Sequence, residues 1–327
     1  MLRRAFLASA ALLPLAACAP TVQHALSPGA AFGGPRLEDD AFVSFDGARL
    51  GLTVWPAEGG EPTAVVVALH GMNDYAAAFG LAAKAWATMG ISTYAYDQRG
   101  YGRSPNRGVW PNEDLIVDDL RAMTALVRTR HPKATLAVVG VSMGGAAAMA
   151  AFGGANPPEA DRVILLAPAV WGWSTQYLPN ATALWLSTRT APDWVVEPPK
   201  FLVKRIKVTD NPEEMRRMSR DPLMLWGARA DALYGIVSLM QRAFDMAGGI
   251  KVPTLYLYGF RDEVIPKAPS FIAAGRLKPT DKTGYYRDGY HLLLSDLQAW
   301  RVYADVAGFI RDPNAPLVSR VGPIPRR

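Results

Sequence analysis

Ser142 stands in a sequence pattern that suits a nucleophile. It is the centre of Gly140-Val141-Ser142-Met143-Gly144, which follows an apolar run and precedes the small residues 146–150. Where a strand turns sharply into a helix, glycines two residues before and after the serine relieve crowding and leave its hydroxyl exposed. The start of the helix also directs its dipole and free N–H groups at developing negative charge. The pattern predicts a reactive serine, and a tight turn around a buried serine is the alternative.

A serine nucleophile needs a base, and the sequence contains four histidines. His24 lies in a segment rich in Ala, Gly and Pro, and His131 precedes Pro132 at the end of an expected helix. His70 begins a His-Gly turn, where the imidazole ring is more often structural. His291 lies between the last expected strand and the last expected helix, so we predict that it is the base.

Short apolar runs of the kind found in buried parallel strands alternate with helical patterns from about residue 41. The expected strands are Ala64–Leu69, Ile91–Tyr96, Leu136–Val141, Val163–Ala167, Thr254–Tyr258 and Thr283–Arg287. The clearest helix has one apolar face, made by Ile116, Leu120, Met123 and Val127. Asp46-Gly47 indicates a hairpin before the first of these strands. This alternation predicts an α/β fold with a mostly parallel sheet that helices cover on both faces.

Two further motifs accompany the serine motif. His70-Gly71-Met72 ends the expected strand at 64–69, and residues 97–104 read Asp-Gln-Arg-Gly-Tyr-Gly-Arg-Ser. In this order the three motifs resemble the α/β-hydrolase family, and the resemblance extends from about residue 41 to 312. The Asp-x-Arg-Gly-x-Gly-x-Ser loop is similar to that of the monoacylglycerol lipase and lysophospholipase branch, which is of the serine aminopeptidase type. The resemblance implies the α/β-hydrolase fold with a helical cap.

The resemblance also implies a catalytic triad. The family keeps its catalytic histidine where His291 stands, and an acidic residue must orient that imidazole and stabilise its charged form. Asp262 follows an expected strand in a Gly-x-x-Asp-x-x-x-Pro sequence that matches the family's. Glu263 beside it and Asp288 in the histidine's own loop are the alternatives. The order Ser142, Asp262, His291 along the chain agrees with the fold.

An oxyanion hole is implied in the same way. By resemblance, the backbone N–H groups of Met72 and Met143 stabilise the negative charge of a tetrahedral intermediate. Acyl transfer to water through Ser142 needs the triad and these donors. The sequence has no zinc-ligand spacing and no Gly-rich phosphate loop, so we expect neither a metal nor an organic cofactor.

Strand signals stop between about residues 170 and 250, where the family carries its cap. This range contains the aromatic residues Trp171, Trp173, Tyr177, Trp185, Trp194, Trp226 and Tyr234. One explanation is that these aromatic side chains pack the cap onto the body. The more specific hypothesis is that some of them line an apolar slot for an acyl chain. Residues 171–230 contain nine Lys or Arg against six Asp or Glu. An aminopeptidase needs carboxylates in its cap to hold the free amine of a peptide. The surplus of cations therefore favours a lipid ester as the substrate. The alternative is that these charged residues only form a solvated face.

The N-terminus has the features of a secretory signal. Arg3 and Arg4 precede an apolar run up to Ala17 that is too short to span a bilayer comfortably. Leu15-Ala16-Ala17-Cys18 resembles the lipobox of bacterial lipoproteins, whose cysteine is lipidated and becomes the first mature residue. Cys18 is the only cysteine of the chain. We therefore expect a signal peptide over residues 1–17 and a lipid anchor at Cys18, with an ordinary cleaved signal as the alternative.

Lipidation of Cys18 would bind the protein to a membrane of the bacterial cell envelope. Ala19 follows the cysteine, and by resemblance to the sorting of such lipoproteins this favours the outer membrane, with the protein facing the periplasm. Residues 18–40 then form a flexible tether, residues 41–312 the hydrolase domain with its cap, and residues 313–327 a C-terminal tail.

The charge of the chain does not indicate a nucleic-acid partner. The net charge of +6 falls to +4 when Arg3 and Arg4 are removed with the signal peptide. No dense basic cluster or stacking motif accompanies this charge, so we expect no nucleic-acid partner. Nothing in the sequence specifies an oligomeric state.

Together these features predict a serine hydrolase that cleaves carboxylic esters, with a lipid-like substrate such as a monoacylglycerol or a lysophospholipid. A peptidase, a thioesterase or a perhydrolase would keep the triad and act on a different substrate. A non-catalytic envelope lipoprotein would keep the fold alone, but such proteins usually lose a member of the triad.

Overall fold

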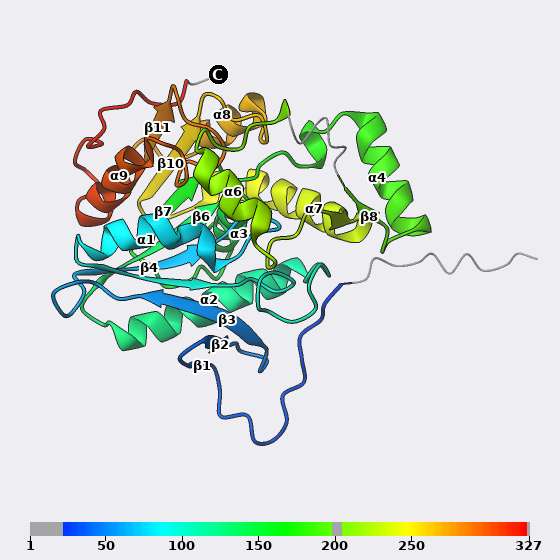
Figure 1. Cartoon of the computed structure of the whole chain (residues 1–327), viewed down its shortest axis with the longest axis horizontal. Coiled ribbons are helices and arrows are strands. Elements are labelled where there is room, and N and C mark those ends of the chain that lie inside the picture. The colour runs from blue at the N-terminus through cyan, green and yellow to red at the C-terminus, as the bar shows by residue number, and fades with distance from the viewer. Residues whose placement is uncertain (1–21, 198–204, 326–327) are drawn as a thin grey trace, which may run out of the picture.

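The structure, a computed structural model, describes residues 22–197 and 205–325. Its main sheet has nine strands in the order β1-β2-β3-β5-β4-β6-β7-β10-β11 (Figure 1). The strands are β1 (Arg36–Leu37), β2 (Ala41–Val43), β3 (Arg49–Trp55), β4 (Ala64–Leu69), β5 (Ile91–Tyr96), β6 (Thr135–Val141), β7 (Arg162–Leu166), β10 (Thr254–Gly259) and β11 (Lys282–Tyr286). The neighbours from β5 to β11 pair in parallel, which confirms the predicted α/β fold.

The strand bounds agree closely with the predicted ones. β4 and β5 have the predicted bounds, whereas β7 and β11 each begin and end one residue earlier than predicted. Ala167, which was expected to end β7, has a φ of +43°. Because an extended strand needs a negative φ, β7 ends at Leu166.

Helices cover both faces of the sheet. They are α1 (Gly80–Ala87), α2 (Glu113–Arg130), α3 (Met143–Phe152), α4 (Leu178–Thr190), α6 (Pro212–Arg220), α7 (Ala230–Met246), α8 (Lys267–Gly275) and α9 (Ala299–Arg311), with short 3-10 turns η1 (Ala76–Phe79), η2 (Trp173–Thr175) and η3 (Ala247–Gly249). One apolar cluster contains residues of α2, α3, α7 and α8, and a second cluster on the opposite face contains residues of α1 and α9. The predicted apolar face of α2 is buried in the first cluster. The sheet is therefore enclosed between two helical layers.

The first strands continue the sheet in the antiparallel direction. β2 pairs with β3 across the predicted hairpin, and Gly47 adopts a φ of +83° at its turn. The predicted tether over residues 18–40 is attached to the body at several places within its described part, among them a hydrogen bond from the Leu26 N–H to Asp46 at 2.8 Å. The Gln23 N–H donates to the Trp110 carbonyl at 2.8 Å, and β1 pairs with β2. The predicted signal peptide and Cys18 lie outside the described residues.

The predicted cap range, residues 170–250, lies between β7 and β10. It contains η2, α4, α6, α7, η3 and a two-stranded ribbon of β8 (Val195–Val196) and β9 (Ala228–Arg229). α7 packs on α3 and α4 packs on α7. α4 and the ribbon project from one end of the molecule (Figure 1). Among the residues that the structure describes, none of the helices has the length and apolar character that crossing a membrane requires.

A buried ion cluster joins the antiparallel hairpin to α2. Arg99 contacts Asp46 at 2.8 Å and Asp119 at 2.7 Å, and all three side chains are at most 3% exposed. Ser44 donates a further hydrogen bond to Asp119. Because two carboxylates share one guanidinium away from water, each charge depends on the others being in place.

We expect replacement of Arg99 to destabilise the fold strongly. In Arg99→Leu the carboxylates of Asp46 and Asp119 stay buried without their cation, which should lower the free energy of unfolding by about 3–5 kcal/mol. Urea denaturation followed by circular dichroism measures this loss. Arg36→Ala, which breaks an exposed ion pair with Glu38, is the control and should cost less than about 1 kcal/mol. Equal losses in the two variants would contradict the expectation.

Candidate active site

Ser142 occupies the sharp turn between β6 and α3. Its backbone has a φ of +51° and a ψ of −114°, a region that residues with a side chain rarely adopt. Backbone hydrogen bonds fix this conformation. The Ser142 N–H donates to the Leu166 carbonyl at 3.0 Å, and its carbonyl accepts from the N–H groups of Ala146 at 3.0 Å and Ala169 at 2.9 Å. The strand–turn–helix context that the sequence predicted is confirmed.

The two glycines of the motif are required by close backbone contacts. A Cβ atom on Gly140 would lie 2.4 Å from the Gly144 carbonyl oxygen, and a Cβ atom on Gly144 would lie 2.1 Å from the Leu69 carbonyl oxygen. Both distances are far below van der Waals contact, so no other residue fits without moving the backbone. The motif therefore reflects the packing of α3 against β4 and β6.

His291 and Asp262 form a buried pair. The Nδ1 atom of His291 lies 2.9 Å from the Oδ2 atom of Asp262, and both side chains are almost completely buried. The other carboxylate oxygen of Asp262 accepts from the N–H groups of Val264 at 2.8 Å and Ile265 at 3.0 Å. These donors hold the carboxylate in a fixed orientation, which leaves the Nε2 atom of the imidazole as its free nitrogen.

The two alternative acidic residues have other partners. The Oε2 atom of Glu263 accepts from the Lys207 N–H at 3.1 Å, and Asp288 forms an exposed ion pair with Arg261 at 2.9 Å. Within the described chain, neither carboxylate hydrogen-bonds to the imidazole of His291. The geometry therefore selects Asp262 as the partner of His291.

The loops that carry Asp262 and His291 are in direct contact. The Arg261 N–H donates to the Gly289 carbonyl at 2.9 Å. A Cβ atom on Gly259 would lie 2.4 Å from the carbonyl oxygens of both Gly289 and Tyr290. The glycine at the end of β10 thus allows the two loops to approach closely enough for the carboxylate to reach the imidazole.

The register of the sheet brings Ser142 to the same edge. Val141 pairs with Leu166 across β6 and β7, and Gly259 pairs with Tyr286 across β10 and β11, so these strands end together. Val141 and Leu292, the neighbours of Ser142 and His291 in the chain, line one small cavity of about 20 Å³. The segments that carry Ser142, Asp262 and His291, which are far apart in the sequence, therefore lie at the same carboxyl edge of the sheet.

Met72 and Met143 lie in the segments that follow β4 and β6 at this edge. Gly71, which precedes Met72, lines the same small cavity, and a Cβ atom there would lie 3.4 Å from the Cβ atom of Ser142. Met143 is the first residue of α3. Within the described part of the chain, the backbone N–H groups of Met72 and Met143 donate to no protein acceptor. Both are thus free to bind an oxygen atom at Ser142.

His70 holds the loop of Met72 in place. Its Nε2 atom accepts from the Gln98 N–H at 2.8 Å, so the proton is on Nδ1, which lies 2.7 Å from the Gly71 carbonyl. The ring is fully buried, and burial lowers the pKa of His70 to about 4. His70 is therefore a neutral structural residue, as the sequence indicated.

The loop at residues 97–104 has a role that the sequence did not reveal. Asp97 accepts from the N–H of Ala76 at 2.9 Å, and the Gln98 side-chain amide donates to the His70 carbonyl at 2.8 Å. Asp97 also accepts from the backbone and side chain of Arg103, both at 2.8 Å. This loop thus fixes both ends of the segment that contains Met72. A signal was present, because residue 97 follows β5, the strand beside β4, which ends directly before His70.

The family of the chain follows from a comparison of its sequence with family profiles. Residues 60–298 match the profile of the family described as serine aminopeptidase, S33, which covers most of the described fold and all of the site residues. The chain belongs to this S33 family. It is an enzyme of the α/β-hydrolase fold, which confirms the resemblance that the motifs indicated.

This S33 hydrolase is similar to several lipases. A monoacylglycerol lipase from Mycolicibacterium smegmatis is 28% identical over 278 residues, covering 83% of this chain and 96% of that protein. A monoglyceride lipase from Rattus norvegicus is 24% identical, covering 78% and 84%. Among solved structures, a soluble variant of monoglyceride lipase from Saccharomyces cerevisiae, in complex with a substrate analog, has a TM-score of 0.69 at 19% identity, covering 89% and 99%. The structural likeness shows the shared fold.

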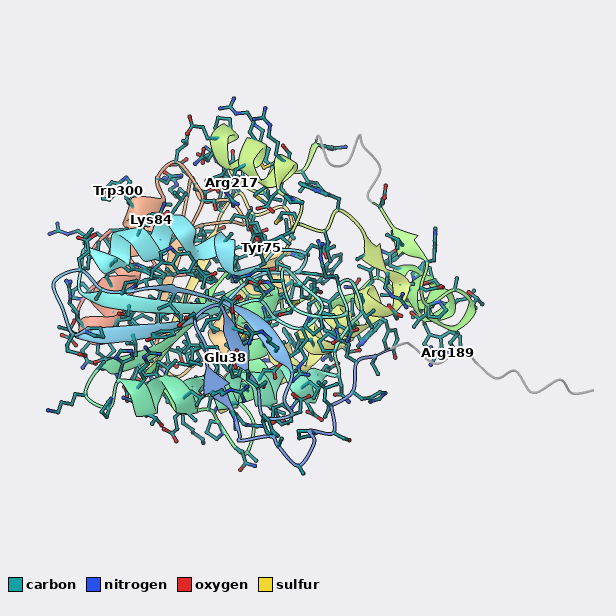
Figure 2. All side chains as sticks on the ribbon, turned by 60° about the horizontal axis from the view of Figure 1, so that its bottom comes forward. Glu38, Tyr75, Lys84, Arg189, Arg217 and Trp300 are labelled. Atoms are coloured by element: carbon teal, nitrogen blue, oxygen red, sulfur yellow. The ribbon has the colours of Figure 1, made fainter. Side chains whose placement is uncertain are left out.

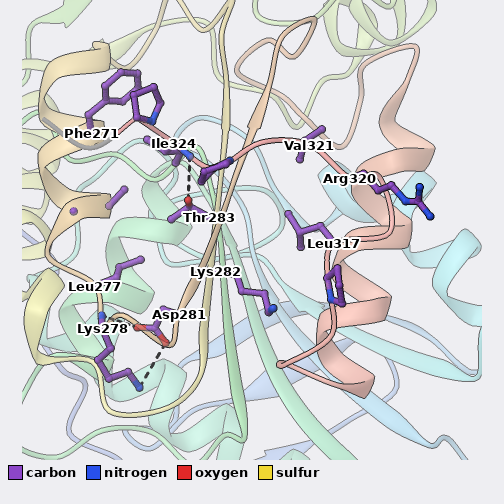
Figure 3. Close-up of a pocket in the computed structure, with 15 residues that line it drawn as sticks. Phe271, Leu277, Lys278, Asp281, Lys282, Thr283, Leu317, Arg320, Val321 and Ile324 are labelled. Carbon is purple, nitrogen blue, oxygen red and sulfur yellow. Dashed lines mark hydrogen bonds and ion pairs between the residues drawn. The ribbon is translucent and has the colours of Figure 1, made fainter.

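Two larger cavities of the S33 hydrolase lie in different regions. One of about 410 Å³ in the cap range is lined by Trp173, Ala181, Thr182, Trp185 and Tyr234. The other, about 660 Å³, lies at the edge strand β11 beneath the C-terminal tail, where the Ile324 N–H donates to Thr283 (Figure 3). The second is lined by Lys282 and Thr283, the first residues of β11, whereas Ser142 and His291 follow the carboxyl ends of their strands, so we do not assign it to the chemistry of Ser142.

The buried neutral state of His70 predicts a dependence of stability on pH. The unfolded chain binds a proton on this residue near pH 6.5 and the folded chain only near pH 4, so its contribution to stability is lost as the pH falls between these values. The advantage of the wild type over His70→Gln in the free energy of unfolding should shrink by about 3 kcal/mol from pH 7 to pH 4. Urea titrations at several pH values measure the difference, and a constant difference would refute the assignment.

Proposed function

We propose that this S33 enzyme is a serine hydrolase that cleaves carboxylic esters through an acyl-enzyme. The observations that carry the proposal are the strained, glycine-flanked Ser142 and the buried His291–Asp262 pair, in segments that follow parallel strands at one edge of the sheet. A serine, an imidazole and an orienting carboxylate in this arrangement perform acyl transfer in unrelated folds.

In the proposed mechanism, the Nε2 atom of His291 accepts the proton of the Ser142 hydroxyl as its oxygen attacks the ester carbonyl carbon. Asp262 keeps the Nδ1–H in place and stabilises the imidazolium. The imidazolium then gives its proton to the leaving alcohol oxygen as the carbon–oxygen bond breaks. A water molecule, deprotonated by the same imidazole, attacks the acyl-enzyme and releases the acid and Ser142.

The N–H groups of Met72 and Met143 are proposed as the oxyanion hole. Their lack of a protein acceptor within the described chain supports this role. Loss of one such donor typically raises the barrier by about 3 kcal/mol. Because the loop of Met72 is held by His70 and Gln98, its donor is oriented before the negative charge develops.

We propose a lipid-like ester, such as a monoacylglycerol or a lysophospholipid, as the substrate. The names of two relatives, a monoacylglycerol lipase and a monoglyceride lipase, support this class. The aromatic cavity in the cap range supports it as well, because the rings of Trp173 and Tyr234 lie 4.8 Å apart beside Trp185. Three aromatic side chains around one hollow suit an acyl chain. The surplus of cations over residues 171–230 does not suit a free amine.

A test of this function compares substrates and variants. Wild-type protein should hydrolyse medium-chain p-nitrophenyl esters much faster than aminoacyl amides, and a fluorophosphonate probe should label it at Ser142. Ser142→Ala should lose at least about a thousandfold in rate and should not be labelled, because the nucleophile is absent. Steady-state kinetics and mass spectrometry of the labelled peptide measure both effects.

Asp262→Asn is the matched variant for the orienting carboxylate. It keeps the size of the side chain but removes the charge that stabilises the imidazolium, so its rate should fall by orders of magnitude while the protein stays folded. Glu263→Gln, in the neighbouring position, is the control and should stay within about tenfold of the wild type. If Ser142→Ala keeps most of its activity, or if amides are the better substrates, the proposed function is wrong.

We further propose that the chain is a lipoprotein of the bacterial cell envelope, anchored through Cys18 to the outer membrane and facing the periplasm. The position of Cys18 after Leu15-Ala16-Ala17 and its being the only cysteine support this location. A lipid anchor would also keep the enzyme beside lipid esters.

The proposed lipid anchor predicts that the wild type and Cys18→Ser differ in their association with the membrane. In bacterial cells that process lipoproteins, the wild type should stay with the outer-membrane fraction in high salt and dissolve in detergent. Cys18→Ser keeps the signal sequence but has no thiol to lipidate, so it should leave the membrane fraction. Immunoblots of the fractions and the mass of the mature N-terminus measure this. Equal membrane retention of both forms would contradict the proposal.

A further inference from the structure

One segment of the predicted cap contacts all three loops of the candidate active site. This segment, residues 207–225, contains α6 and is called the arm below. It touches the loop of Asp262, the loop of His291 and the loop of Met72 through separate hydrogen bonds. These loops follow three different strands, β10, β11 and β4. The arm is therefore placed to set their relative positions.

The first end of the arm joins the acid loop to the base loop. The Lys207 N–H donates to the Oε2 atom of Glu263, the residue after Asp262, at 3.1 Å. One residue further, the Val208 carbonyl accepts from the N–H of Leu292, the residue after His291, at 2.8 Å. Two consecutive residues of the arm thus bind the neighbours of both members of the buried pair.

The next residues of the arm support the base loop from its other side. The Asp210 side chain accepts from the Leu297 N–H at 2.8 Å. Asp296 accepts from the Tyr290 N–H at 2.9 Å, directly before His291. Burial raises the pKa of Asp296 to about 6, while its hydrogen bond with the Tyr290 N–H acts in the opposite direction. Asp296 is only 4% exposed, so this hydrogen bond is shielded from water.

The other end of the arm holds the loop of Met72. The Tyr75 hydroxyl donates to the Oδ2 atom of Asp221 at 2.7 Å, and the Leu225 N–H donates to the Asn73 carbonyl at 3.0 Å. Asn73 follows Met72 directly and has a φ of +66°, so its strained backbone needs such support. Burial and the hydrogen bond to Asp221 raise the pKa of Tyr75 to about 12, so its hydroxyl stays a donor.

The arm is internally braced between these two ends. Asn211 caps α6 by accepting from the N–H groups of Glu213 and Glu214. Arg217 contacts Glu214 at 2.9 Å and Asp221 at 3.6 Å, which fixes the carboxylate that Tyr75 binds. Tyr75 and Arg217 lie on the same side of the molecule, whereas Arg189 on α4 lies at its far end (Figure 2). The arm is therefore held by its own hydrogen bonds and ion pairs between the two ends.

We propose that the arm positions the catalytic groups, with Asp210 holding the His291 loop and Asp221 holding the oxyanion loop through Tyr75. This proposal rests on the proposed function of Ser142, Asp262 and His291. Asp210, Asp221 and Tyr75 are positioning residues, since they contact the loops and not the reacting atoms. A misplacement of about 1 Å between reacting groups costs on the order of a hundredfold in rate.

The test uses the full chain with two minimal variants, Asp210→Ala and Tyr75→Phe. The first removes the acceptor of the Leu297 N–H, and the second removes only the hydroxyl that binds Asp221. Each should lower kcat for a p-nitrophenyl ester by about tenfold or more and change KM by less than about threefold. The rate of fluorophosphonate labelling should fall in parallel, because the probe needs the positioned Ser142 and not the leaving alcohol.

Matched controls separate positioning from other effects. Asp210→Asn keeps an oxygen acceptor and should restore most of the kcat lost in Asp210→Ala. Arg242→Ala breaks an exposed ion pair with Asp114 on α2 and should leave kcat unchanged. Thermal unfolding of each variant confirms that the kinetics refer to folded protein.

Three results would overturn the proposal while leaving the proposed function intact. They are an unchanged kcat in both arm variants, a rise of KM alone, and a failure of Asp210→Asn to restore kcat. An unchanged kcat would mean that the arm has only a structural role. A rise of KM alone would mean that the arm belongs to the substrate site. Failure of Asp210→Asn to restore kcat would mean that the negative charge of Asp210, and not its hydrogen bond, is the important property. Failure of the proposed function gives a different result, because Ser142→Ala would then keep most of the hydrolytic activity.

Discussion

The turn from β6 into α3 is the constraint on which the rest of the site depends. Gly144 approaches the backbone of Leu69 so closely that a Cβ atom would lie 2.1 Å from its carbonyl oxygen. All residues of α3 are buried, so the helix cannot shift to relieve the contact. Ser142 is consequently held at a positive φ by packing on several sides. The other proposed catalytic groups must therefore be brought to a serine whose position is fixed.

The parallel sheet and its loop contacts bring them there. Since β6, β7, β10 and β11 end together, the segments after them project from one edge. Register alone places a loop only approximately. Backbone contacts between Arg261 and Gly289, and those of the arm, connect one loop to the next. The cap range thus contacts the loops of the proposed site as well as containing the aromatic cavity.

Buried polar groups connect the loop of Met72 and the antiparallel hairpin to the segment at residues 97–104. His70 and Gln98 bind each other's loops through two hydrogen bonds, and Arg99 follows directly with its ion pairs to Asp46 and Asp119. In a low-dielectric interior such contacts are strong when satisfied and costly when one partner is lost. The short motif at residues 97–104 therefore serves both the oxyanion loop and the attachment of the antiparallel hairpin.

The sequence by itself determined the fold class, most strand bounds and the identity of Ser142, because buried strands and the glycines of a strand–helix turn impose local patterns. His291 and Asp262 were predicted by elimination and resemblance, and their contact required the tertiary structure. Local patterns could not reveal that residues 97–104 hold the Met72 loop, or that the arm reaches three loops. Those contacts join residues up to 152 positions apart, as between Asn73 and Leu225, and only the packing of the folded chain brings such partners within hydrogen-bond distance.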